Sequence, residues 1–352
     1  MSAGNALVWG CAGVAALALN AGGVALFRRW ALAREVLDVP NARSSHTVPT
    51  PRGGGLVLVL VTLIGTLVGV TAGVVAWRPA VLWVGAAALA VAAVSWVEDL
   101  HRVPLGVRLA VQAAAAVATL AAVGSLRLVA IPLLGVVHLG PVGAVLEFIW
   151  IVGLANAFNF MDGIDGIAGG QALVAAVGWM LLAASGSPLQ WIAMMLAAGS
   201  LGFLFFNWAP AKLFMGDVGA VFLGFTLAVL PLMAARSEPR NAFAGVLLVW
   251  PFLFDTAFTL VRRLAKGENV LASHRSHLYQ RLVIAGWSHA SVSMLYGGLA
   301  LVGVGMAALW TAGGRSAGAI VTAVIGVTAV GLWALTLVVE GASARRNTSA
   351  VS

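Results

Sequence analysis

Long runs of apolar residues alternate along this chain with short polar segments. Each run is too long for a single strand, and most approach the ~20 residues that a helix needs to cross a bilayer. The pattern therefore predicts an all-α polytopic membrane protein with about eleven transmembrane helices. We expect them near residues 4–26, 53–76, 79–97, 105–124, 140–157, 167–184, 189–206, 218–235, 241–261, 289–311 and 316–340.

The composition agrees with this pattern. Of 352 residues, 61% are hydrophobic and only 9% are charged, which is too little charge to solvate the surface of a soluble domain. The net charge of +8 is then a sign of membrane topology, and we expect no nucleic-acid partner. The single cysteine, Cys11, excludes an intrachain disulfide. No basic region precedes the first run, which predicts a retained anchor and not a signal peptide.

Two segments do not fit the helical pattern. Residues 127–139 are too few to span a membrane and are interrupted by Pro132 and Gly135, so we expect a small hairpin or a re-entrant piece there. The tail, residues 341–352, is small and polar, and we expect it to be disordered. Because no soluble insertion or clear repeat interrupts the pattern, residues 1–352 are predicted to form one integral-membrane domain.

The basic residues predict the orientation. If the 27–52 loop lies inside and the helices alternate, fifteen of the 20 Lys and Arg residues fall on the inside. This distribution follows the positive-inside rule. It predicts an amino terminus outside and a carboxy terminus inside.

The acidic residues favour the same side. Asp255 lies late in the ninth predicted helix, Glu340 lies at the inner end of the last, and Glu147 and Glu238 lie elsewhere. A transporter would more naturally place ionisable residues near the midplane, so this distribution favours an enzyme acting at the inner face. The other eight of the 12 acids fall in or beside inner loops: Glu35, Asp38, Glu98, Asp99, Asp162, Asp165, Asp217 and Glu268.

The most informative stretch is 156–170, NAFNFMDGIDGIAGG. It places Asn156, Asn159, Asp162 and Asp165 at a membrane face, where ionisable residues usually have a function. Its glycines break the helical pattern and allow a ligand to approach the backbone. A helix restarting near Ile167 would direct its positive end at phosphate oxygens in this loop. The alternative is an ordinary Asp-Gly turn that caps a helix.

Two inner loops that precede this stretch carry candidate charges. In the first, Arg43 and Arg52 flank a Pro- and Gly-rich turn, and a guanidinium suits phosphate oxygens. Their alternative role is topological. In the second, Glu98 and Asp99 are adjacent carboxylates, which repel each other unless a cation or a shared proton is present. One is a candidate general base and the other a cation ligand. The alternative is a solvated helix end in which the pair has no catalytic role.

Two later inner loops complete the set. Asp217 follows Gly216 at the start of the eighth predicted helix and is a candidate Mg²⁺ ligand, although an N-cap is the alternative. His274 and His277 have a helical i, i+3 spacing around Arg275, so both side chains are expected to face one site. Phosphate or sugar binding suits this loop better than zinc, because a third nitrogen or sulfur ligand is missing nearby. An interfacial basic helix is the alternative.

Taken in order, five motifs resemble the bacterial polyprenyl-phosphate phosphosugar transferases (MraY/WecA-like). They are PTPRGG, the acidic pair, NxxNxxDGxDGxAxG, FMGDxGxxFLG and the inner HRSHLYQRL loop, over roughly residues 35–290. The last resembles the branch that initiates O-antigen chains. The resemblance implies a multi-pass enzyme of the bacterial cytoplasmic membrane. Such an enzyme transfers N-acetylhexosamine 1-phosphate from a UDP-sugar to undecaprenyl phosphate and releases UMP.

The same resemblance implies roles for single residues. Asp217 would bind Mg²⁺, or Mn²⁺ in its place, and Glu98 and Asp99 would position or deprotonate the lipid phosphate. The family usually has Asp where this chain has Glu98, which makes Asp99 the stronger candidate. The nucleotide and pyrophosphate site would be shaped by Asn156, Asn159, Asp162 and Asp165. The sugar nucleotide would be contacted by His274, Arg275 and His277.

Some alternatives stay open at this point. An ion-coupled transporter or exporter of lipid-linked sugars would also be polytopic. A CDP-alcohol phosphatidyltransferase is disfavoured, because the arginine and later aspartates of its motif do not follow Asp162 and Asp165. The sequence indicates neither the sugar nor the glycan pathway. Membrane lipids are expected partners, and whether the chain forms a homodimer is left open.

Overall fold

The computed structural model describes residues 3–40, 48–76, 78–269 and 274–349. Nearly all of the ordered elements are helices, joined by two small antiparallel sheets. The helices are α1 Ala3–Ala33, α2 Gly55–Thr71, α3 Pro79–Leu100, α4 Leu105–Val123, α5 Val142–Met161, α6 Ile167–Leu182, α7 Pro188–Asn207, α8 Gly216–Ala234, α9 Arg240–Leu248, α10 Trp250–Ala265, α11 Leu278–Ile284, α12 His289–Ala312 and α13 Ala317–Ser349. The strands are β1 Leu37–Asp38, β2 Thr50–Pro51, β3 Leu128–Ile131 and β4 Gly135–His138.

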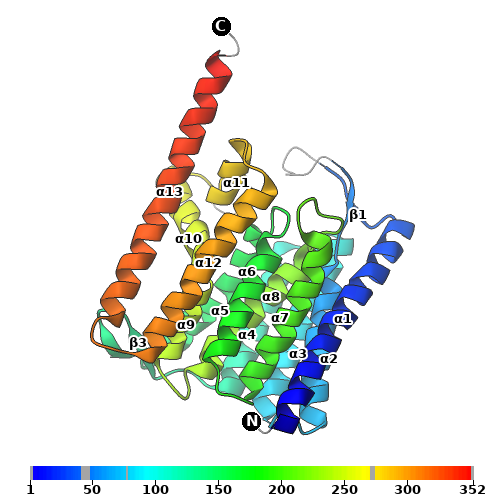
Figure 1. Cartoon of the computed structure of the whole chain (residues 1–352), viewed down its shortest axis with the longest axis vertical. Helices are drawn as coiled ribbons and strands as arrows, with labels where there is room; N and C mark the ends of the chain where they lie inside the picture. Colours follow the sequence, from blue (N-terminus) through cyan, green and yellow to red (C-terminus); the bar gives the residue numbers. More distant parts are fainter. Residues whose placement is uncertain (1–2, 41–47, 77, 270–273, 350–352) are drawn as a thin grey trace.

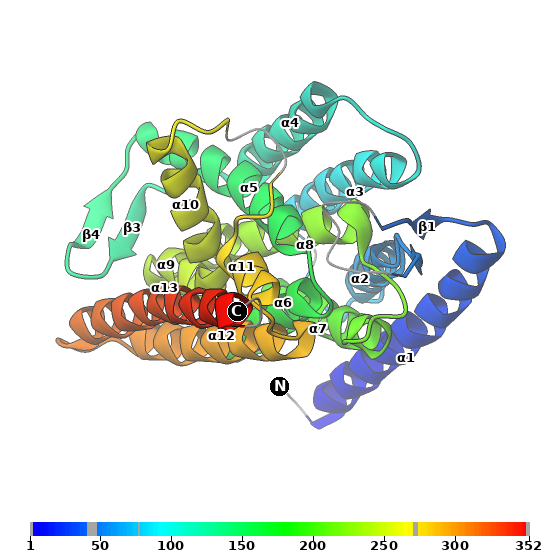
Figure 2. The ribbon, with the colours of Figure 1, turned by 90° about the horizontal axis from the view of Figure 1, so that it is seen from above.

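Helix α8 is the centre of the bundle, with α2, α3, α5 and α6 around it (Figure 2). Nearly all of its side chains are buried, including the large ones of Phe222 and Phe225. Small residues let neighbouring backbones come close, as is usual in membrane bundles. A Cβ on Gly55 of α2 would lie 2.4 Å from the Cα of Gly219 in α8. This close packing fixes the start of α8 against the segments that surround it.

The structure confirms the all-α polytopic fold. All eleven predicted segments are helical, although the ninth is divided in two. Among the described residues, eight helices are long and apolar enough to cross a membrane, and the bent pair α9–α10 would make a ninth. Helices α2 and α6 are also apolar but have only 17 and 16 residues, which is about 25 Å of helix. The predicted number of eleven spans therefore includes two helices near the minimum length.

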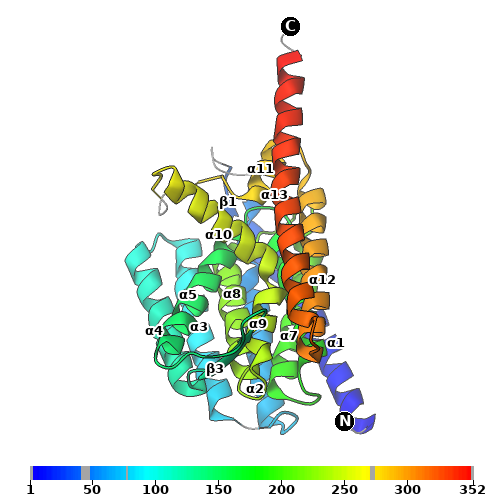
Figure 3. The same ribbon diagram turned by 90° about the vertical axis from the view of Figure 1, so that its left-hand side faces the viewer.

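The ninth predicted helix bends by 75° between α9 and α10. The break falls at Val249, just before Trp250 and Pro251. Proline in the first turn of a helix needs no backbone N–H there, but within a continuous helix it would remove a hydrogen bond. Helix α10 consequently leaves the bundle at an angle (Figure 3). The apolar pattern is continuous across this break, which is why it predicts one helix.

The strands and the tail are the parts of the structure outside the predicted spanning helices. The 127–139 segment forms the hairpin β3–β4, one of the two predicted alternatives, with Leu128 opposite His138. Strands β1 and β2 close the first long loop. The predicted disorder of the tail is wrong for residues 341–349, because α13 continues to Ser349 and extends beyond the other helices (Figure 1). Its alanines and arginines are good helix formers, which explains the continuation.

The two ends of the bundle carry different connections. We call the upper end in Figure 1 the site end; α3 and α5 finish there and α8 and α11 begin there. The opposite end, which holds β3–β4 and the α8–α9 connection, is called the far end. All the inner loops predicted from the sequence join helices at the site end. Because successive helices run back and forth between the two ends, these loops bring distant parts of the sequence to one face.

Candidate active site

Five carboxylates from three parts of the chain lie at the site end, and we call them the acidic cluster. They come from the last turn of α3, the turn between α5 and α6, and the first turn of α8. Each of these positions is a helix end, where the backbone leaves polar groups without helical partners. The members of the acidic cluster are Glu98, Asp99, Asp162, Asp165 and Asp217.

Asp99 holds the start of α8. Its Oδ1 accepts a hydrogen bond from the backbone N–H of Asp217 and its Oδ2 accepts one from Val218, both at 3.0 Å. Gly216 has a φ of +77° and packs so closely on Asp99 that a Cβ would lie 2.6 Å from Oδ2. A carboxylate at this place also balances the positive end of the helix. Asp99 therefore fixes where Asp217 points, and the alternative that Asp217 itself is the N-cap is wrong.

Asp217 is oriented by two side chains. Its Oδ2 accepts hydrogen bonds from Nη2 of Arg108 at 2.9 Å and from Nδ2 of Asn159 at 3.2 Å. The other arm of Arg108 binds Oε1 of Glu98 at 3.1 Å. The Asp217 side chain is 30% exposed, so one face of the carboxylate remains open to a ligand. Arg108 thus joins two members of the acidic cluster from α4.

Asp162 differs from its neighbours because its carboxylate accepts no hydrogen bond from any described residue. Burial raises the pKa of Asp162 well above its usual range, and neighbouring carboxylates raise it further. Those neighbours are Asp217, Asp99 and Asp165, in decreasing order of effect. An acid that is close to three others and short of donors is a candidate ligand for a cation or a proton.

Asp165 ties the turn to two other segments. Its Oδ1 lies 3.3 Å from Nδ1 of His289, the first residue of α12, and its Oδ2 accepts from the N–H of Ala211 at 3.0 Å. The next residue, Gly166, has a φ of +78° and donates its N–H to Oδ1 of Asn207 at 3.0 Å. Helix α6 then begins at Ile167, as predicted. Its positive end faces the acidic cluster.

The segment 274–282, called the His loop, contains α11 (Figure 2) and contacts the end of α5 that leads into Asp162. The predicted helical spacing of His274 and His277 is wrong, because α11 begins only at Leu278. The two rings nevertheless lie 5.0 Å apart. Nδ1 of His277 is 3.2 Å from Oδ1 of the buried Asp255. Burial, with smaller effects of nearby positive charges, lowers the pKa of His274 to about 4, so that ring is neutral at neutral pH.

Known proteins are similar to this chain over most of its length. Residues 81–235 match the family described as Glycosyl transferase family 4. A decaprenyl-phosphate N-acetylglucosaminephosphotransferase of Mycobacterium leprae is 30% identical over 84% of this chain and 82% of its own length. The chain belongs to the polyprenyl-phosphate phosphosugar transferase family. It is therefore a phosphotransferase, and the transporter alternative is not supported.

Two more members of the family show how far the similarity extends. A protein named probable undecaprenyl-phosphate N-acetylglucosaminyl 1-phosphate transferase, from Bacillus subtilis, is 29% identical over 77% of this chain and 76% of its own length. A phospho-N-acetylmuramoyl-pentapeptide-transferase of Listeria welshimeri is 29% identical over 47% of this chain and 51% of its own length. The similarity to the first type thus covers more of this phosphosugar transferase.

Not every residue singled out in the sequence lies within the acidic cluster of the transferase. Arg52 reaches it and donates a hydrogen bond from Nη2 to the backbone oxygen of Asp99. Asn156 instead donates from Nδ2 to Oε1 of Gln112 at 2.6 Å and is held against α4. Arg275 is placed within electrostatic range of Tyr279 in the His loop. Arg43 lies outside the described residues.

Three residues at the site have no role in the sequence analysis. Arg108 is counted there among the fifteen inner basic residues without being named, His289 does not appear, and Asp255 is left without a role. A weak signal exists for each, since all are polar residues near the predicted inner ends of apolar runs. Their partners come from distant segments: Asp217, Asp165 and His277, respectively. Spacing along the chain cannot identify such pairs.

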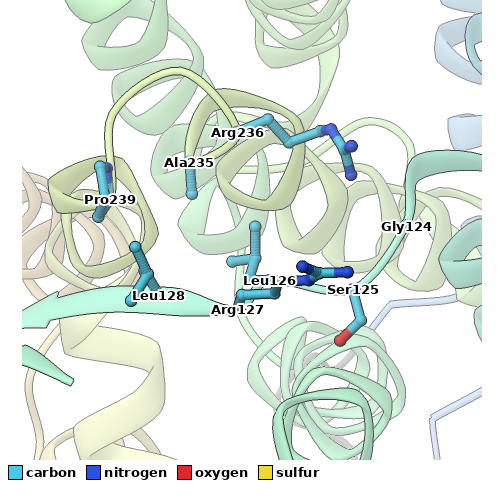
Figure 4. Close-up of a pocket in the computed structure, with 8 residues that line it drawn as sticks. All are labelled: Gly124, Ser125, Leu126, Arg127, Leu128, Ala235, Arg236 and Pro239. Atoms are coloured by element: carbon cyan, nitrogen blue, oxygen red, sulfur yellow. The ribbon is translucent and has the colours of Figure 1, made fainter. Parts of the chain in front are cut away.

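The far end has its own cavity, of about 530 Å³, between the α4–β3 and α8–α9 connections (Figure 4). Arg127, Arg236 and Ser125 line it. Nearby, the buried Glu147 accepts hydrogen bonds from the N–H of Leu126 at 2.7 Å and from the hydroxyl of Ser125 at 3.2 Å. None of the predicted site residues lines this cavity, so it is separate from the acidic cluster.

Proposed function

We propose that this phosphosugar transferase transfers N-acetylhexosamine 1-phosphate from a UDP-sugar to undecaprenyl phosphate and releases UMP. The product would start a lipid-linked cell-envelope glycan, an O-antigen or a similar polymer. The names of the B. subtilis and M. leprae relatives specify N-acetylglucosamine, which makes UDP-N-acetylglucosamine the first donor to test. The excess of basic residues in the loops of the site end supports a cytoplasmic location of that end in a bacterial inner membrane.

The observation that carries the proposal is the excess of negative charge in the acidic cluster. Its five carboxylates are matched, among the described residues, by the nearby cations Arg52 and Arg108 and by His289. Asp162 has no cationic partner there. Both substrates are anionic as well, so a further cation has to offset the charge before two phosphate groups can approach each other. These features fit a divalent cation.

We propose Mg²⁺ as that cation, with Mn²⁺ as an alternative. Within the described ranges, no three His, Cys, Asp or Glu side chains converge closely enough to form a complete metal site. Mg²⁺ commonly takes only one or two carboxylates and completes its shell with water and substrate phosphates. The oxygens of Asp217 and Asp162 would be its protein ligands. When bound, it would neutralise the pyrophosphate of the donor.

The protein groups then have distinct tasks in the transfer. An oxygen of the lipid phosphate attacks the phosphorus that carries the sugar, a new P–O–P linkage forms, and the bond to UMP breaks. Arg52 and Arg108 can stabilise the negative charge on these phosphates. Asp99 keeps the start of α8 in place, and Asn159 orients Asp217. Little covalent work remains for the protein, so positioning accounts for most of the catalysis.

The surroundings of the acidic cluster suit a lipid acceptor. Leu100 and Leu105, which flank the α3–α4 turn, and Phe160, which precedes Asp162, are exposed large apolar residues. In a protein embedded in a bilayer, such side chains contact lipid tails. An isoprenoid chain could lie against this surface while its phosphate reaches the acidic cluster. A soluble acceptor would not need this arrangement.

The proposal is tested with purified protein, undecaprenyl phosphate, Mg²⁺ and a panel of UDP-N-acetylhexosamines. UMP release and the lipid-linked product are measured together. We expect turnover with at least one donor, its loss in EDTA, and recovery on addition of Mg²⁺ or Mn²⁺. Full turnover in EDTA would overturn the metal requirement, and no turnover with any donor would overturn the assigned reaction.

A further inference from the structure

Asp255 in α10 is more completely hydrogen-bonded than any member of the acidic cluster among the described residues. Its side chain is 0% exposed, and a buried carboxylate without donors would be strongly unfavourable. Five groups satisfy it, two of them backbone N–H groups at the start of α11. The donors are the N–H of Leu278 at 2.8 Å, the N–H of Tyr279 at 3.0 Å, Nδ1 of His277 at 3.2 Å, the hydroxyl of Thr259 at 3.2 Å and the hydroxyl of Tyr296.

These bonds determine how the His loop sits on the transferase. Helix α11 has seven residues, too few to be stable on its own, so its first turn depends on the contact with α10. Asp255 supplies that contact through both carboxylate oxygens. The same Oδ1 that binds Leu278 also faces Nδ1 of His277. A proton on Nδ1 leaves Nε2 directed away from Asp255, and the bond thereby sets the direction of the ring.

The ring of His277 is also held from its sides. It stacks with Phe160, with ring centres 6.4 Å apart, and with Tyr279 at 5.8 Å. Phe160 is two residues before Asp162 in the turn that contributes to the acidic cluster. His277 therefore occupies the boundary between the His loop and the acidic cluster.

Tyr279 connects the same loop to the acidic cluster by a second route. Its hydroxyl donates to the backbone oxygen of Phe160 at 3.0 Å. Gly163 permits this approach, because a Cβ there would lie 2.1 Å from the hydroxyl. Burial raises the pKa of Tyr279 well above its usual range, and Asp255 and Asp162 raise it further, so the phenol remains a donor. The His loop and the 160–163 turn are thus joined as one unit.

We infer that Asp255 is a positioning residue that holds His277 toward the sugar-nucleotide donor. The inference rests on the proposed function, because it assigns the His loop to the donor and not to the lipid. The carboxylate does not touch substrate, since it is fully buried and all its bonds go to protein groups. It acts through His277, and its loss should therefore weaken the use of the donor more than the use of the acceptor.

The test begins with Asp255→Asn in the full-length protein. The amide has the same shape but cannot accept from all five donors. We expect the KM for the UDP-sugar to rise about tenfold or more, by analogy with the loss seen when the partner that orients a metal-binding histidine is removed. The KM for undecaprenyl phosphate should change by less than about threefold. Glu147→Gln is the matched control: it makes the same acid-to-amide change at a buried carboxylate of the far end, and its donor KM should equal that of the wild type.

A double variant separates positioning from a general loss of structure. In a His277→Gln background, Asp255→Asn should change the donor KM by less than about threefold, because the group through which it acts is already absent. Tyr296→Phe, which removes one donor to Asp255, should raise the donor KM by a smaller factor in the same direction. This variant decides the question if Asp255→Asn does not fold.

The outcomes distinguish this inference from the proposed function. Wild-type protein that releases no UMP would overturn the proposed function itself. Wild-type turnover together with an unchanged donor KM in Asp255→Asn would overturn only the role of Asp255. Equal effects of Asp255→Asn on both substrates, or full additivity with His277→Gln, would also overturn it and assign Asp255 a purely structural role.

Discussion

The acidic cluster and Asp255 lie at the same end of the bundle, yet their carboxylates are satisfied to different degrees. Asp255 accepts from five donors and is fully buried. Asp162 accepts from no described donor and lies near three other carboxylates. A buried acid with all its hydrogen bonds made stabilises a local structure. An acid left short of partners is instead available to a ligand.

Asp99 and Asp217 lie between these extremes. Both oxygens of Asp99 bind the start of α8, whereas only Oδ2 of Asp217 is engaged by the described residues. The degree of satisfaction therefore separates two structural acids, Asp255 and Asp99, from two functional acids, Asp217 and Asp162. Substitutions that exchange a carboxylate for an amide test this separation directly.

The largest effect is expected from Asp217→Asn. An amide cannot provide the negative charge that holds a cation beside the substrate phosphates, and such metal contacts supply several kcal/mol of transition-state stabilisation. Turnover should fall by about two to three orders of magnitude. UMP release is the measurement. Glu147→Gln at the far end is the matched control, since that buried carboxylate is remote from the site, and it should retain wild-type turnover.

Asp162→Asn should separate stability from activity. A carboxyl whose pKa is raised by folding contributes its full stability below its unfolded pKa and loses it as the pH rises through the folded pKa. Neutral pH lies above the unfolded pKa of this carboxyl, so Asp162 destabilises the metal-free protein there. We expect Asp162→Asn to raise the Tm at pH 7 in EDTA and to lower UMP release sharply. A lower Tm at that pH would contradict the description of Asp162 as an unsatisfied acid.

The sequence pattern predicts the helices well because spanning a membrane requires long apolar runs, and these are visible without tertiary information. It fails where a single residue acts against a continuous pattern. Pro251 divides one predicted helix into α9 and α10. The predicted disorder after Glu340 is wrong for the opposite reason, since a polar segment can still continue an existing helix.

The acidic cluster is also largely predictable. Asp162, Asp165 and Asp217 stand out because acids are rare in this chain and fall at helix ends. The partners that orient them are not predictable, because pairs such as Arg108 with Asp217 are 109 residues apart. Asn156 lies in the same stretch, but its side chain binds Gln112 of α4 and no member of the acidic cluster among the described residues. Spacing identifies which residues reach the site end but not which of them face the ligand.

His274→Asn is expected to have a moderate effect and to leave the pH profile unchanged. With a pKa of about 4, His274 is already neutral from pH 5.5 upward. Loss of one neutral hydrogen bond to the substrate should lower kcat/KM by about three- to tenfold. The profile of log kcat/KM between pH 5.5 and 8 should keep its shape. A shift of its acid limb would show that a charged His274 takes part in binding.

The smallest effect concerns a second contact that holds α11, made with α13. Arg281 in α11 binds Glu340 in α13 through two hydrogen bonds, the longer being 2.6 Å. Glu340 is partly exposed, and pairs of that kind contribute about 0–1 kcal/mol. Glu340→Gln should therefore raise the donor KM only about two- to threefold.

The small rise in donor KM expected for Glu340→Gln would still distinguish an acid that only holds α11 from one that also orients a histidine. Glu340 and Asp255 hold the same short helix, but only Asp255 also orients His277. If Glu340→Gln raised the donor KM as much as Asp255→Asn, the position of α11 as a whole would control donor binding. The direction of the His277 ring would then be a secondary consequence. A clear difference between the two variants assigns the effect to the bond between Asp255 and His277.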